Sequence, residues 1–201
     1  MQIQTIEELR TLYSAPTKRV IQKEVHSIDT HIEKFLSLSP LLVIGSASAQ
    51  FEMDVSPRGG DPGFVKVMDT QTLLIPDAPG NNRLDTFQNI IETAQVGLLF
   101  FLPGVDEMLR IYGRATLHTE ESLLNHFAGL KHSPKVVIKV NILGAYMHCA
   151  KALMRSNLWS PEAQVDRSVL PTMGQIIKDH AQLDTPVETQ EEMLKRYEID
   201  L

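Results

Sequence analysis

The feature that most constrains the fold is a series of short β-like segments between Leu41 and Leu117, each bounded by turn residues. In one of them, Phe51, Met53 and Val55 alternate with polar residues, the period-two pattern of a half-buried strand. Many short strands with few long helices between them favour a barrel over a doubly wound α/β sheet. The predicted strands are Leu41–Gly45, Phe51–Val55, Phe64–Met68, Thr72–Ile75, Val96–Leu102 and Met108–Leu117.

Helices are predicted on both sides of this region. Thr5 and Glu8 fit a capping box, and Ile28, Ile32, Phe35 and Leu36 are spaced as one apolar helical stripe. Leu84–Thr93 is predicted to be helical, with Phe87, Ile90 and Ile91 facing inward. Four further helices are predicted in the C-terminal part: Glu120–Leu130, Ala145–Arg155, Met173–Ala181 and one capped by Thr189. The expected organisation is one domain over residues 1–201, with N-terminal helices to about residue 40 and a helical extension over about 145–201.

Composition excludes several classes of protein. The net charge of −6, from 25 acidic and 19 basic residues, argues against a general nucleic-acid binder, which needs a basic excess. No apolar run approaches the length of a membrane span, and residues 1–10 lack the apolar core of a signal peptide. With one cysteine, Cys149, no intrachain disulfide can form. We therefore expect a cytoplasmic protein with neither a nucleic-acid nor a membrane partner.

Two irregular stretches hold polar residues suited to an anion. Ser56 and Arg58 begin a predicted loop, Ser56–Gly63, and Asn82 and Arg83 immediately precede the predicted helix at Leu84. Free backbone N–H groups at a helix start, together with an arginine, favour phosphate binding. The alternative is that Arg83 only pairs with Asp77 or Asp85 at the surface.

Three strings resemble the pyridoxamine-5′-phosphate-oxidase-related family of FMN-binding split barrels. They are Asp54–Gly60 (DVSPRGG), Pro79–Ile90 (PGNNRLDTFQNI) and Tyr112–Ala115 (YGRA). The resemblance covers about residues 41–117 and extends over 139–161 to a subgroup that carries the segment HCAKAL. It implies a mainly β fold with flanking helices (α+β), a six-stranded FMN-binding split barrel.

The resemblance also implies a homodimer with FMN at the subunit interface, and it suggests site residues. Asn82 and Arg83 would hold the FMN phosphate, and Ser56 and Arg58 would lie along the flavin or its ribityl chain. The weaker candidates are Asn89 and Arg114, and a later group is expected to reach the flavin of the neighbouring subunit: Lys151, Arg155, Ser156 and Trp159. No catalytic side chain and no metal site are predicted.

The sequence departs from true pyridoxamine-phosphate oxidases in two places. It lacks their strand motif of arginine, apolar run and lysine, and it lacks their C-terminal arginine–histidine motif after Trp159. The resemblance therefore implies an FMN-dependent oxidoreductase acting with another small-molecule substrate or reductant, because hydride transfer at the flavin needs no obvious general acid or base. Two alternatives stay open: a non-catalytic flavin- or haem-binding split barrel, and an interaction domain with an empty groove.

Overall fold

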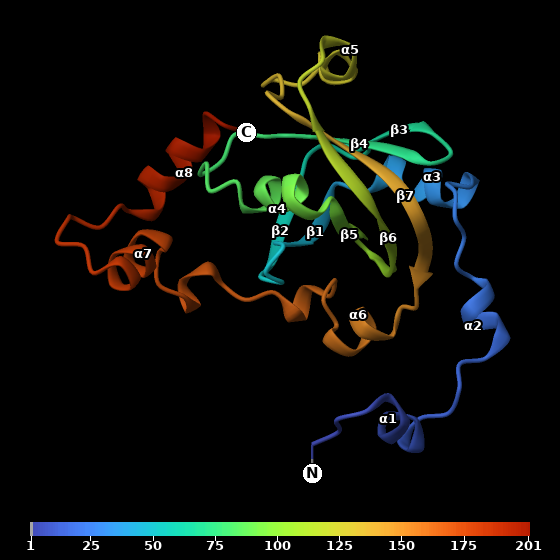
Figure 1. Cartoon of the computed structure of the whole chain (residues 1–201). Coiled ribbons are helices and arrows are strands. Elements are labelled where there is room, and N and C mark those ends of the chain that lie inside the picture. Colours follow the sequence, from blue (N-terminus) through green and yellow to red (C-terminus); the bar gives the residue numbers. More distant parts are fainter. Residues whose placement is uncertain (1) are drawn as a thin grey trace.

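A computed structural model of the chain describes residues 2–201. Its centre is a seven-stranded antiparallel sheet with the order β2-β1-β5-β6-β7-β4-β3 (Figure 1). The strands are β1 (Leu41–Ala47), β2 (Met53–Gly59), β3 (Lys66–Asp69), β4 (Thr72–Pro76), β5 (Gln95–Leu102), β6 (Val105–His118) and β7 (Val137–His148). The helices are α1 (Ile6–Leu12), α2 (Lys18–Gln22), α3 (Thr30–Leu38), α4 (Asp85–Thr93), α5 (Glu121–Leu124), α6 (Lys151–Ser156), α7 (Met173–Ala181) and α8 (Gln190–Glu198).

The expectation of six strands is wrong, because β7 adds a seventh that the sequence reasoning missed. Residues 145–148, assigned to a helix over Ala145–Arg155, end this strand, and α6 spans only Lys151–Ser156. Ala145 pairs with Ile111 of β6 and forms a bridge to Val25, so cross-strand pairing overrides the local helix preference. Within residues 2–201 no pairing joins the two edge strands, β2 and β3.

The core lies on one face of the sheet under α3 and α4. Ile32, Phe35 and Leu36 of α3 are buried there, as their spacing predicts, together with strand residues such as Leu42 and Ile44. On α4, Phe87 and Ile90 are buried as expected, but Ile91 is 76% exposed. The inward orientation predicted for Ile91 is therefore wrong, because Ile91 lies beside the buried stripe and no element within residues 2–201 covers it.

Strand β2 presents its apolar residues outward. Met53 and Val55 are 72% and 68% exposed, whereas the polar residues that alternate with them are half-buried. The register explains this, since Arg58 lies opposite Leu42 and Ser56 opposite Ile44, both core residues of β1. Two predictions are thus corrected: the apolar row of β2 does not face the core, and residues 56–59 belong to the strand rather than to a loop.

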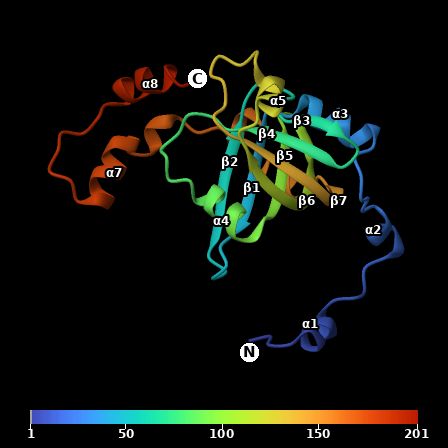
Figure 2. The same ribbon diagram turned by 45° about the horizontal axis from the view of Figure 1, so that its top comes forward.

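The terminal segments extend away from the sheet (Figures 1 and 2). The capping boxes at Thr5 and Thr189 are both present and begin α1 and α8 as predicted, and α7 has its predicted bounds. The helix predicted over Glu120–Leu130 is shorter, since α5 ends at Leu124 and a 3₁₀ turn follows. None of the helices within residues 2–201 has the length and apolar content that a bilayer crossing requires.

Candidate functional site

A polar network joins the covered face of β2 to the first turn of α4. The guanidinium of Arg58 donates to the hydroxyl of Ser56, to the carbonyl of Pro57 at 2.8 Å and to the hydroxyl of Thr86 at 3.4 Å. Thr86 in turn donates to the carboxylate of Asp54. Alternation along β2 puts residues 54, 56 and 58 on the same face, so the strand itself aligns three of these side chains.

Charge in this network is partly removed from water. Burial lowers the pKa of Arg58, and the carboxylates of Asp77 and Asp54 oppose that shift. Burial raises the pKa of Asp77, against a backbone hydrogen bond at Ala78 and the charge of Arg58. The network therefore holds one half-buried cation between two carboxylates.

The loop that leads into α4 has an unusual backbone. Asn82 and Leu84 both adopt the left-handed region, with φ of 59° and 60°, and for leucine this conformation is strained. The side-chain oxygen of Asn81 accepts the N–H of Arg83 at 3.1 Å. Leu84, the N-cap of α4, makes no side-chain capping bond, so this helix start has N–H groups to offer an anion.

Arg83 lies at the surface beside this helix start. Its side chain is 74% exposed and pairs with Asp85 at 2.8 Å, as the alternative from sequence proposed. Such an exposed pair contributes little to stability and leaves the guanidinium able to turn to another anion. Arg83, the helix start and the Arg58 network together form what we call the β2–α4 mouth.

The remaining predicted residues lie elsewhere. Asn89 is buried one turn further along α4 and donates to the hydroxyl of Ser46 at 3.0 Å, which ties the helix to β1. Arg114 is exposed on β6, opposite Gln95 and Asn141.

The later group gathers around α6. Lys151, Arg155 and Ser156 are exposed on that helix, while Trp159 is half-buried and its indole N–H donates to the carbonyl of Val105 at 3.0 Å. Within residues 2–201 no hydrogen bond or ion pair joins this group to the β2–α4 mouth.

Sequence reasoning missed Asp54, Thr86 and Asp77 as members of the network. The alternation along β2 is a signal for Asp54. If the polar face of the strand is taken as the covered face, Asp54 lies beside Ser56 and Arg58. Thr86 gave a weaker signal, its position in the first turn of the helix that follows Arg83. For Asp77 no local pattern was available, because its approach to Arg58 depends on the tertiary fold.

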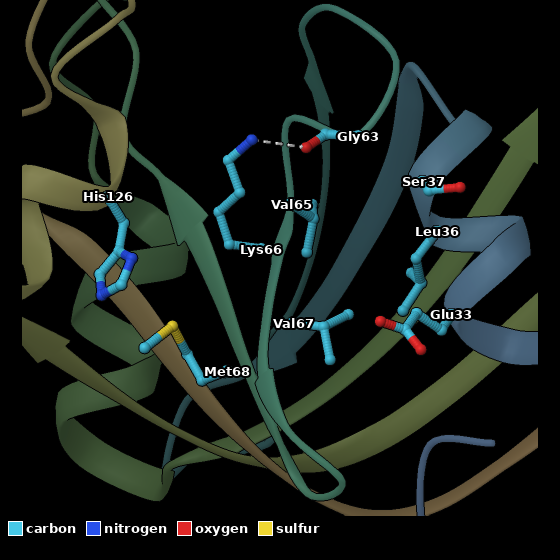
Figure 3. Close-up of a pocket in the computed structure, with 9 residues that line it drawn as sticks. All are labelled: Glu33, Leu36, Ser37, Gly63, Val65, Lys66, Val67, Met68 and His126. Carbon is cyan, nitrogen blue, oxygen red and sulfur yellow. Dashed lines mark hydrogen bonds between the residues drawn. The ribbon is translucent and has the colours of Figure 1, made fainter. Parts of the chain in front are cut away.

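Two shallow hollows lie on another part of the surface. One, of about 450 Å³, lies between α3 and β3, and a second, of about 240 Å³, adjoins it and shares Gly63, Lys66 and His126. In Figure 3 the amine of Lys66 turns to the carbonyl of Gly63, at 3.0 Å, while Glu33 lies on the opposite side. No predicted site residue lines either hollow, and residues 2–201 contain no cluster of His, Cys, Asp and Glu that fits a metal ion.

Comparison with known proteins points to one family. The sequence model of the family described as pyridoxamine 5′-phosphate oxidase matches residues 28–149. No curated protein matches the chain.

Two solved structures of HupZ share the fold at low sequence identity, and a third structure is similar. HupZ from group A Streptococcus is 18% identical, with 60% of this chain and 94% of HupZ covered and a TM-score of 0.50. A substituted form of HupZ is 17% identical, with 60% of this chain and 99% of that protein covered and a TM-score of 0.51. A putative pyridoxamine 5′-phosphate oxidase from Lactobacillus delbrueckii is 15% identical, with 61% and 95% coverage and a TM-score of 0.48.

Proposed function

The chain belongs to the pyridoxamine 5′-phosphate oxidase family, and from this premise we propose that it binds FMN at the β2–α4 mouth and works as an FMN-dependent oxidoreductase. The observation that carries the proposal is the uncapped start of α4, whose first turn is bound by two arginines: Arg58 donates to Thr86 and Arg83 pairs with Asp85. A helix start and a guanidinium fork are the groups that bind a phosphate monoester. FMN has one such phosphate and needs no second, pyrophosphate-binding glycine loop.

Each residue of the mouth has a distinct role in this proposal. Arg83 turns from Asp85 to the FMN phosphate, and the backbone at Asn82 approaches it. Ser56 and Arg58 lie along the ribityl chain or the flavin ring, with Thr86 and Asp54 fixing the guanidinium in place. Bound FMN would supply the redox chemistry, and the protein contributes binding, orientation and the local charge.

A homodimer with FMN in the groove between the subunits forms part of the proposal. The β2–α4 mouth is open to solvent at Arg83, and β2 exposes an apolar row that a partner subunit would cover. Within residues 2–201 the α6 group forms neither a hydrogen bond nor an ion pair with the mouth of its own chain. We infer that Lys151, Arg155, Ser156 and Trp159 instead approach the flavin held by the other subunit.

The visible spectrum of the purified protein tests the cofactor assignment. We expect flavin absorption that bleaches with dithionite, and we expect the chromophore released by heat to co-elute with FMN. FAD as the dominant flavin would contradict the single-phosphate site. A Soret band would favour the haem-binding alternative, and a colourless protein that takes up no added FMN would remove the proposal.

We expect the protein not to oxidise pyridoxamine 5′-phosphate efficiently. That substrate brings a second phosphate, which needs charge-assisted contacts beyond those used for FMN. After Trp159, Arg167 already donates to two backbone carbonyls and Arg196 is bound to the carboxylate of Glu188. A steady-state assay of pyridoxal 5′-phosphate formation checks this, and turnover of about 1 s⁻¹ or more, ordinary for an enzyme on its own substrate, would contradict it.

A further inference from the structure

The chain exposes far more surface than a compact monomer of its size. A folded monomer of 22.6 kDa is expected to expose about 9,500 Å², whereas this chain exposes 13946 Å². The excess of about 4,400 Å² reflects the terminal segments, which extend away from the sheet in both views (Figures 1 and 2).

Hydrogen bonds hold the C-terminal segment to the rest of the chain near its two ends, and the segment bows outward between them (Figures 1 and 2). At one end Trp159 is bonded to Val105. At the other, Lys131 donates to the carbonyl of Glu198 at 3.1 Å and His132 contacts the carbonyl of Ile199 at 2.8 Å. We call residues 160–189, between these attachments, the arch.

The arch carries apolar side chains that its own chain leaves uncovered. They include Val165, Val169, Leu170 and Ile177, of which Val169 and Ile177 are 61% and 50% exposed. The longest helix of the arch, α7, has nine residues, fewer than an isolated helix needs to be stable in water. Its stability therefore requires packing beyond its few contacts with α8.

The arch bows out on the side of the molecule where β2 and α4 lie, and both views agree on this (Figures 1 and 2). On that side Met53 and Val55 of β2 and Ile91 of α4 are also exposed. Two groups of exposed apolar side chains, on the arch and on β2 and α4, thus belong to segments on the same side of the molecule.

We propose that the arch clasps a second copy of this chain against the β2–α4 side, with each arch of the dimer reaching over the other subunit. This inference rests on the proposed homodimer and adds which segments make it. Covering half of the excess surface on both chains would bury about 4,400 Å² in total, within the range of obligate homodimers. Two-fold symmetry makes the exchange reciprocal, and the β2–α4 mouth is completed only when the partner is seated.

Two full-length variants, Val169→Asp and Ile177→Asp, test the clasp by sedimentation velocity. Both positions are exposed in the single chain, so the subunit should keep its circular dichroism spectrum. A carboxylate placed in an apolar interface is strongly unfavourable, and we expect the dimer to dissociate at least 100-fold more readily. The matched control is Leu38→Asp, at an apolar position that is 40% exposed. It belongs to α3, a helix that lies on the other side of the molecule in both views.

Amide hydrogen exchange of the unmodified protein gives an independent measurement. Residues 173–181 should exchange slowly, and their protection should fall on dilution below the dimer dissociation constant. Three results would each overturn the clasp. The first is protection that does not depend on concentration, and the second is an unmodified protein that is monomeric. The third is a set of arch variants that lose thermal stability but remain dimeric. Bound FMN is measured in the same samples by absorbance and separates the two proposals. A monomer saturated with FMN contradicts the clasp and the shared dimer site but leaves FMN binding standing. A clasped dimer that never binds FMN contradicts the cofactor proposal alone.

Discussion

Replacing Arg83 with alanine is expected to weaken FMN binding by about one to two decades while leaving the unfolding temperature almost unchanged. A charge-assisted contact to phosphate contributes about 1.5–3 kcal/mol to binding. Arg83 itself is mostly exposed and pairs only at the surface with Asp85, so the fold gains little from it. Titration of the apo-protein with FMN, followed by flavin fluorescence, measures the affinity, and calorimetry measures the stability.

Two further arginine variants sharpen this result. Arg19→Ala, at an exposed position on α2, is the matched control and should change neither quantity. Arg58→Ala should lower both, because Thr86 loses a donor and Asp54 and Asp77 lose a neighbouring cation. If Arg83→Ala retains full affinity for FMN but melts earlier, Arg83 is a structural residue and the phosphate site lies elsewhere.

Replacing Gly113 with alanine is expected to lower the free energy of unfolding. Overpacking a site costs about 1–3 kcal/mol, and we expect a loss toward the upper end of that range. An added methyl group would clash with the backbone oxygen of Asn141 and lie 3.2 Å from the Cα of Ile142, both in β7. Backbone of a neighbouring strand cannot move aside as a flexible side chain can. For a chain of this length the loss corresponds to a melting temperature lower by about 2–12 °C.

The matched control is Gly97→Ala on β5, where the added methyl group has no atom within 4 Å. We expect this variant to be as stable as the unmodified protein or more stable by about 0.4–1 kcal/mol, because alanine restricts the unfolded chain. Equal melting temperatures for the two alanine variants would show that the close approach of β6 and β7 is wrong.

How far the sequence predicts the fold differs between its two halves. From residue 41 to 117 the strands were found because turn residues bound each apolar segment. The pairing of β1 with β5 joins segments distant in sequence and was not predicted. Strand β7 was missed because its last residues, from Ala145 to His148, run into a segment of good helix formers. Its identity as a strand depends on partners distant in sequence, Ile111 and Val25, which local patterns do not encode.

The row of Phe51, Met53 and Val55 shows a second limit. Alternation predicts that one face of a strand is covered, but it does not say which face the chain itself covers. Here the polar face meets α4 and the apolar face is left exposed. Apolar residues form the core of a chain and also its exposed apolar surfaces. From one sequence, an exposed apolar row is therefore easily mistaken for a core-facing row.

The positions of the candidate residues in the fold were predicted in part, and their role stays a prediction. Arg58 and Ser56 form a hydrogen-bonded pair, and Asn82 and Arg83 lie at the start of α4 as expected. The strain at Leu84 was not predictable, because leucine seldom adopts a left-handed conformation and nothing local requires it.

A crystal structure of the protein with bound FMN tests the central claim most directly, through the distance from the phosphate oxygens to Arg83. We predict that the guanidinium of Arg83 and backbone N–H groups at the start of α4 lie about 2.7–3.2 Å from those oxygens. The flavin should then extend toward Ser56 and Arg58. A phosphate held instead in the hollow beside Lys66, or on the exposed face of β6 near Arg114, would contradict the account.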